Sequence, residues 1–362
     1  MKSISSAWKK ELGGSAFAVL ISALLTSAVL IFLGESPSIL WEAFTSTFFN
    51  SFGLGYTLYY TTPLILTGLS VSLCFHAGLF NIGSEGQLHL GAVAVIALAF
   101  FFPNLPWFFA IPCGILVAGL AGGFWGWIAG FLKAKRGSHE VIVTILLNFI
   151  AITGVNYLIL YPFKNHSVQN PETIAISKPF FIPRLSELTG YFGSEIFRTT
   201  PVNFTLFFSV LVAIALHLFL FHTSRGYEFR AMGQNSSAAK FNGVNLSRNV
   251  LIAFFLGGAL SGFVGVNEIM GFQHKLIEGF SPQYGFTGIA VALMARNRPL
   301  GVILAALLFG SIHNGAREIE FLSEKITKEI SIVMESILVI LIAGHSYFAS
   351  AFMKLFKGGS ND

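Results

Sequence analysis

The chain alternates between long apolar runs and short polar connections along nearly its whole length. Several runs reach the roughly 20 residues that a helix needs to cross the hydrocarbon core of a bilayer. The expected spans cover residues 14–33, 56–75, 87–102, 107–132, 141–161, 203–221, 250–270 and 330–352. Two shorter apolar pieces, residues 284–295 and 300–312, are joined by R-N-R-P, and we expect both to cross as short tilted helices. The pattern predicts an all-α, polytopic membrane protein with about ten transmembrane helices.

Composition supports a membrane protein and argues against two other classes. Apolar residues make up 54% of the chain and charged residues only 11%, far from an ordinary soluble domain. We therefore expect a single transmembrane domain over residues 1–362, surrounded by membrane lipids. The net charge of +5 does not indicate nucleic acid, because the basic residues lie at span ends rather than in a stripe with interleaved aromatic side chains. Cys74 and Cys113 lie inside apolar runs and form no disulfide or metal pattern.

The distribution of Lys and Arg predicts the orientation. With the N-terminus inside and ten crossings, 14 of the 22 basic residues fall on the inner side, as the positive-inside rule favours. Both termini are then cytoplasmic. Residues 162–202, a polar segment punctuated by prolines, form an outer loop. Residues 223–248 form an inner, cytoplasmic loop.

The inner loop has the properties of a contact element. It is polar, carries four positive charges, and lies between two long apolar runs. Residues 228–240 can form a short amphipathic helix, and Gly243 follows where a helix needs a left-handed C-cap. Such a helix at the cytoplasmic face could take up the movement of a soluble motor protein. An ordinary basic loop between two spans is the alternative.

The segment N-I-G-S-E-G-Q, residues 81–87, is unusual because no Lys or Arg occurs between Lys10 and Lys133 to hold this turn in water. Its glycines can break a helix and free backbone groups, which Asn81, Glu85 and Gln87 could satisfy. Irregular backbone at membrane depth is tolerated where it is buried in protein or lines a cavity. A carboxylate inside the membrane marks a candidate functional site. The alternative is a plain cytoplasmic turn with Glu85 in water.

The second half contains a weaker echo of this segment. Asn267 and Gln273 stand at the end of the span at residues 250–270, and Ser281 opens a short helix. Interrupted segments at corresponding positions in two halves indicate a transport path. Solvated helix ends are the alternative for Asn267 and Gln273. Inside the span at residues 141–161, we expect Asn148 to make interhelical hydrogen bonds.

Known catalytic patterns are missing from the sequence. It contains no H-E-x-x-H, no paired aspartates, no G-x-S-x-G and no G-x-x-x-x-G-K-[ST]. We therefore predict a transport protein that is not an enzyme, with no catalytic residues, bound metal or cofactor on this chain. If nucleotide drives the transport, the nucleotide site lies on another polypeptide.

Five motifs occur together in the order of one known family. They are T-P-L-I-L-T-G-L-S-V-S (62–72), G-L-F-N-I-G-S-E-G-Q (78–87), K-A-K-R-G-S-H-E-V-I-V-T-I-L-L-N (133–148), R-A-M-G-Q-N-S-S-A-A-K-F-N-G-V-N (230–245) and G-F-T-G-I-A-V-A-L-M-A-R-N-R-P-L-G (285–301). With them the chain resembles permease subunits of bacterial ABC importers in the branched-chain amino-acid and simple-sugar superfamily, above all the nucleoside-type permeases.

The resemblance implies an all-helical, type II-like permease with broken or half helices in the cytoplasmic (inner) membrane of a bacterium. It also implies three partners: an ATPase subunit that binds ATP and Mg, a second homologous permease in a heterodimer, and a substrate-binding lipoprotein or periplasmic protein. The family's coupling loop corresponds to residues 230–245, within the inner loop at residues 223–248. The residues expected to couple to the ATPase are Arg230, Gly233, Asn235, Ala238, Ala239, Gly243 and Asn245.

The resemblance favours a nucleoside as the solute, moved inward, and a simple-sugar or riboflavin permease is the alternative. The residues expected along the translocation path are Asn81, Glu85, Gln87, Asn267, Gln273 and Ser281. A hypothesis of a different class is an ion-coupled secondary transporter. That mechanism requires a titratable relay in the membrane, for which Glu85 and Glu268 are the candidates.

Overall fold

The computed structural model describes residues 24–191 and 197–327, together with residues 21, 332, 333, 336, 337 and 340. This part of the chain is helical, with three isolated β-bridges and no sheet. The predicted span at residues 330–352 lies mostly outside the described residues, and the span at 14–33 lies partly outside them.

Seven described helical stretches are long and apolar enough to cross a membrane. They are α3 (Ser51–His76), α4 (Ser84–Phe101), α5 (Trp107–Arg136), α6 (Glu140–Leu160), α8 (Thr205–His222), Leu246–Gln273 and α13 (Pro299–Leu322). The stretch Leu246–Gln273 consists of α11 (Leu246–Gly262) and the π-helix η2 (Val266–Gln273). The shorter helices are α2 (Ser38–Phe49), η1 (Lys178–Phe180), α7 (Leu185–Tyr191), α9 (Ser224–Gln234), α10 (Ser236–Phe241) and α12 (Tyr284–Met294). A multi-pass helical protein is confirmed, and the count of ten crossings is not.

The two short apolar pieces differ from expectation. The second piece belongs to α13, whose 24 residues span about 36 Å, enough for a full crossing. The apolar pattern stops early because the helix continues through polar residues that are buried. Asn314, for example, is fully buried and donates a hydrogen bond of 2.9 Å to the carbonyl oxygen of Gly53. The first piece, α12, has only 11 residues and covers about 16 Å.

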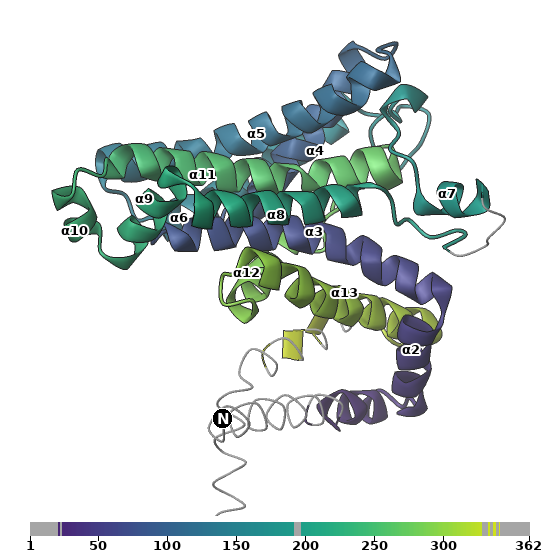
Figure 1. Ribbon diagram of the computed structural model, residues 1–362. Helices are drawn as coiled ribbons and strands as arrows, with labels where there is room; N and C mark the ends of the chain where they lie inside the picture. The colour runs from purple at the N-terminus through teal and green to yellow at the C-terminus, as the bar shows by residue number, and fades with distance from the viewer. Residues whose placement is uncertain are drawn as a thin grey trace, which may run out of the picture. The chain divides into compact units, whose positions relative to one another are not determined.

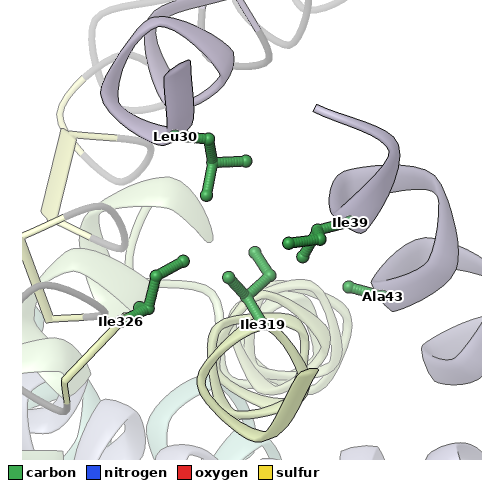
Figure 2. Close-up of a cluster of buried hydrophobic side chains, with 5 residues drawn as sticks. All are labelled: Leu30, Ile39, Ala43, Ile319 and Ile326. Atoms are coloured by element: carbon green, nitrogen blue, oxygen red, sulfur yellow. The ribbon is translucent and has the colours of Figure 1, made fainter. Parts of the chain in front are cut away.

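The chain divides into two compact units, one formed by residues 1–54 and 311–362 and the other by residues 55–310. In the first unit, a small apolar core joins segments from both ends of the chain (Figure 2). It consists of Leu30, Ile39, Ala43, Ile319 and Ile326. The Ser46 hydroxyl also donates to Glu318 at 2.9 Å, so that polar and apolar contacts close this unit.

The second unit is a helix bundle built around α3, α4, α5, α6, α8 and α11 (Figure 1). Helices α9 and α10 lie at one end of the bundle, and α7 lies at the other. The predicted inner loop and the predicted outer loop, which contain these helices, therefore stand at opposite ends.

Glycines hold α5 and α11 in close contact. A Cβ atom added to Gly122 would overlap the carbonyl oxygen of Gly258, and one added to Gly258 would overlap the carbonyl oxygen of Gly122. The same holds for Gly262 against Ala118. Residues 119–130 contain three G-x-x-x-G spacings, a pattern that lets helix backbones approach closely in lipid.

Replacing Gly122 by leucine should therefore separate α5 from α11. The added side chain must displace backbone atoms, which costs on the order of 2 kcal/mol of stability. The matched control is Gly154→Leu in α6, because an added Cβ there has no atom within 4 Å. Thermal unfolding of the two detergent-solubilised variants measures the difference, and equal stabilities would contradict the prediction.

Candidate functional site

Helix α4 begins inside the protein. After α3 ends, the chain runs back along it, so that the Asn81 amide donates to the Ser70 hydroxyl at 3.1 Å. The Asn81 and Gln87 amides exchange two hydrogen bonds of 3.0 Å each. Asn81 is 0% and Gln87 1% exposed, and Glu85, in the first turn of α4, is 3% exposed. Burial contradicts the alternative of a turn with Glu85 in water.

The start of α4 receives its missing hydrogen bonds from α6. The first N–H groups of a helix have no partner within the helix. Here the Gly86 N–H donates to the Asn148 side-chain oxygen at 2.8 Å. The Asn148 amide nitrogen donates to the carbonyl oxygen of Ile82 at 2.9 Å, one turn earlier. The prediction that Asn148 bonds between helices is confirmed.

The start of α12 is held in the same way by Glu85. The Gly285 N–H donates to the Glu85 carboxylate at 2.7 Å, and the Ser281 hydroxyl is hydrogen-bonded to the same carboxylate. The Tyr284 N–H donates to the Ser281 hydroxyl at 3.3 Å. A carboxylate at a helix N-terminus is also favoured by the helix dipole. We call Asn81, Glu85, Gln87 and Ser281 the α4–α12 cluster.

A second buried carboxylate, Glu268, lies in η2 and is 0% exposed. Its carboxylate accepts hydrogen bonds from the Tyr59 hydroxyl at 2.6 Å, the Asn267 amide at 3.0 Å and the Gln273 amide at 3.4 Å. The Asn267 oxygen in turn accepts from the Thr205 hydroxyl at 2.6 Å. We call this group the π-helix cluster: Tyr59, Asn203, Thr205, Asn267, Glu268 and Gln273.

The six residues predicted for the translocation path thus fall into two groups. The structure brings Asn81, Glu85, Gln87 and Ser281 together and places Asn267 and Gln273 in the π-helix cluster. Asn267 is 1% exposed, so it is not a solvated helix end. That these side chains line the path stays a prediction.

Sequence reasoning missed Tyr59 and Thr205 of the π-helix cluster. Their hydroxyl groups lie near the ends of apolar spans, where such side chains commonly serve as interface or capping residues. Nothing in the local pattern shows that they meet Glu268 and Asn267, because they come from α3 and α8, far away in the sequence.

The predicted inner-loop helix is in fact two helices. Instead of one helix over residues 228–240, α9 ends and α10 begins at Asn235, whose side-chain oxygen accepts the Ala238 N–H at 2.9 Å. Asparagine competes for backbone groups in this way and favours helix caps over helix interiors. Asn245 caps α11 similarly, accepting the Arg248 N–H at 3.0 Å. Gly243 has a φ of 85°, which confirms the predicted left-handed C-cap.

Several residues predicted to couple to an ATPase face the protein itself. The Arg230 guanidinium lies 5.1 Å from the centre of the Phe221 ring, and Ala239 is only 4% exposed. Ala238 is exposed. The most prominent exposed side chain of α10 was missed: Phe241 is 94% exposed. An aromatic residue within a polar loop outside the apolar spans is the signal that could have indicated it.

A chain of contacts connects α9 with α12. A Cβ added to Gly233 would overlap the carbonyl oxygen of His76 at the end of α3. The His76 ring nitrogen and the Ser72 hydroxyl contact the carbonyl oxygen of Asn297 at 2.8 and 2.6 Å. Asn297, just beyond α12, has a φ of 56°, a left-handed conformation that asparagine adopts more readily than most residues other than glycine. The end of α3 therefore links the loop helices to the end of α12.

The segment after α6 covers the far end of the bundle. Its backbone bonds to the chain that follows η2, as in the bond of 2.7 Å from the Ile176 N–H to the His274 oxygen. Lys275 forms an ion pair of 2.7 Å with Glu172. The His274 ring stacks on Phe181, and burial, together with nearby Arg184, lowers the pKa of His274. The His274 imidazole is therefore uncharged at neutral pH.

Within the described part of the chain, no group of three His, Cys, Asp or Glu side chains is arranged to hold a metal ion. The site consists of buried amides, hydroxyls and two carboxylates at interrupted helices. Interrupted helices with polar groups at membrane depth are typical of multi-pass transport proteins.

Comparison with known proteins defines the class further. Residues 53–343 match the family model described as branched-chain amino acid transport system / permease component. The chain is 32% identical to the guanosine ABC transporter permease protein NupP of Bacillus subtilis over 95% of this chain and 96% of the relative. It is 34% identical to the glucose ABC transporter permease protein TsgB13 of Haloferax volcanii over 87% and 81%, and 30% identical to the nucleoside ABC transporter permease protein NupB of Lactococcus lactis over 90% and 89%.

The chain therefore belongs to this family of ABC transporter permeases, and it is a transport subunit rather than an enzyme. Each of these three organisms contributes a second, more distant match. These are the guanosine permease NupQ of B. subtilis, 26% identical, the putative glucose permease TsgC13 of H. volcanii, 25% identical, and the nucleoside permease NupC of L. lactis, 24% identical. Relatives of this chain thus occur as pairs.

Proposed function

We propose that this chain is a permease subunit of an ATP-driven importer that carries a nucleoside inward across the cytoplasmic membrane of a bacterium, with both termini in the cytoplasm. The observation that carries the proposal is its similarity, over nearly its whole length, to permeases named for guanosine and for nucleosides. The interior is compatible with such a solute. A nucleoside needs hydrogen-bonding groups and aromatic surface rather than a neutralising charge.

The importer would contain three further proteins. ATP and Mg would be bound by a separate ATPase subunit, since the chain has no phosphate-binding loop of its own. A second homologous permease would complete the path, as the paired relatives suggest. A substrate-binding lipoprotein or periplasmic protein would deliver the solute at the outer loop, residues 162–202.

Movement of the ATPase would reach the path through the loop helices. Helix α10 would contact the ATPase, and α9 packs on the end of α3 through Gly233. The end of α3 is bonded to Asn297, just beyond α12, and Glu85 of α4 is bonded to the start of α12. A displacement of α9 would thereby shift α12 against α4, where the α4–α12 cluster lies. This contact chain supports the proposed coupling between residues 223–248 and the interrupted helices.

The test is transport by the complete importer in vesicles that contain ATP. We expect nucleoside accumulation that requires both ATP and the solute-binding protein. Glucose and riboflavin serve as competing solutes, because one relative is a glucose permease and another is described as a probable riboflavin import permease. If the importer takes up glucose or riboflavin but no nucleoside, the proposed solute is wrong. If this chain alone accumulates the solute with only an ion gradient, the assignment to an ATP-driven importer is wrong.

A further inference from the structure

Helix α12 begins near the middle of the membrane. Its far end is tied to Ser72 and His76, at the end of α3 that packs on α9. From there 11 residues rise about 16 Å, roughly half of a hydrocarbon core about 30 Å thick. The start of α4 lies at a similar depth. Its hydrogen-bond partner Asn148 stands eight residues, or about 12 Å, along α6 from the start of that helix.

A polar side chain is exposed at this depth. Gln283 immediately precedes α12 and is exposed, with a φ of 65° that turns the chain into the helix. Its side-chain amide does not cap α12 and makes no hydrogen bond to another described residue. An unpaired amide facing hydrocarbon is costly, because lipid offers it no partner. The face of α12 that carries Gln283 is therefore unsuited to lipid.

An aromatic ring is also exposed in the first turn of α12. Phe286 follows Gln283 by three residues and is 41% exposed. The buried residues of α12 include Tyr284, Gly285 and Gly288. The free face of α12 thus begins with an amide and a ring, and it continues toward the loop-helix end with Leu293, which is 52% exposed.

We propose that Gln283 and Phe286 line the inner half of the transport path and recognise the base of the nucleoside in transit. A glutamine amide offers a donor and an acceptor in one plane, which suits the hydrogen-bonding edge of a base. A phenylalanine ring offers a surface on which the face of a base stacks. Gln283 and Phe286 therefore contact the edge and the face of the same base. This assignment rests on the proposed function and adds to it the residues that select the solute.

The test measures uptake by the whole importer with its solute-binding protein saturated by solute, so that delivery is not limiting. Guanosine and inosine differ by one amino group on the base. We expect Gln283→Leu to change their uptake ratio about tenfold, through the lost amide contacts. Phe286→Ala should lower uptake of both by roughly tenfold or more, whereas Phe286→Trp, which keeps a stacking surface, should retain it. Leu293→Ala, on the same face, is the control and should stay within about twofold of the unchanged protein.

Thiol labelling tests the same surface without transport. Gln283→Cys is made in a Cys113→Ser background, in which the remaining Cys74 is buried. In the assembled importer, we expect a water-soluble thiol reagent to modify position 283 and the transported solute to slow the reaction. An unreactive thiol means that lipid, the second permease or another part of this chain covers the face, and this overturns the inference.

The outcomes separate the inference from the proposed function. If the unchanged importer takes up no nucleoside, the proposed function fails and the base-recognition role fails with it. If it takes up nucleosides but Gln283→Leu leaves the guanosine-to-inosine ratio unchanged, only the assignment to Gln283 and Phe286 is wrong.

Discussion

Replacing Glu85 by alanine is expected to reduce uptake by about a hundredfold. The Gly285 N–H and the Ser281 hydroxyl both bond to this carboxylate inside the protein. Losing the acceptor leaves these buried donors without a partner, at a cost of about 3 kcal/mol, which corresponds to roughly a hundredfold in an equilibrium. The start of α12 would no longer be held against α4, so movement at one end of α12 would not reach the other.

Glu85→Gln separates this role from a need for charge. A glutamine side chain keeps an oxygen acceptor for the Gly285 N–H, and its uptake should fall by only about tenfold or less. Asn156→Ala, in α6, is a control because the Asn156 side chain is only partly buried and makes a long bond of 3.4 Å to Glu278. Uptake rates and hydrogen exchange over residues 284–286 are the measurements. Equal loss in the alanine and glutamine variants would show that the negative charge, not the hydrogen bond, is what matters.

Introducing arginine at Ala238 is expected to release the ATPase subunit and abolish uptake. Ala238 is exposed on α10, next to the exposed ring of Phe241. A long charged side chain there would prevent close contact with a partner protein. Truncating Phe241 to alanine should weaken the association by about 2 kcal/mol, near thirtyfold, as for an aromatic hot spot.

The control for added charge is Ser247→Arg, which lies in the first turn of α11 at the same end of the bundle and is also exposed. Co-purification of the ATPase with each variant measures association, and vesicle uptake measures coupling. An ATPase that remains bound to Ala238→Arg with normal uptake would refute the proposed role of α10. Loss of binding in Ser247→Arg as well would point to a general charge effect.

Features that depend on neighbouring residues were predicted well from the sequence. The bounds of α6 and α8 lie within two residues of the predicted apolar runs, because a helix in lipid must satisfy its own backbone groups. Gly243 was predicted as a C-cap from its position alone. The five motifs likewise led to the family that the comparisons establish.

Features that depend on distant partners were not predicted. The sequence marked Glu85 as unusual but did not connect it with Gly285, 200 residues further along. It indicated one helix where Asn235 separates two, and it ended α13 early at polar residues that turn out to be buried. The predicted contact role of Arg230 was assigned without knowing that its side chain lies on Phe221.

The amino-acid sequence by itself determined which segments enter the membrane, because hydrophobicity and backbone hydrogen bonding act over a few neighbouring residues. Only the tertiary structure decided how the interrupted helices are completed. The N–H groups freed at the starts of α4 and α12 are satisfied by Asn148 and Glu85 from other helices. Which side chain meets which helix start depends on the packing of segments far apart in the chain, and no local pattern contains that information.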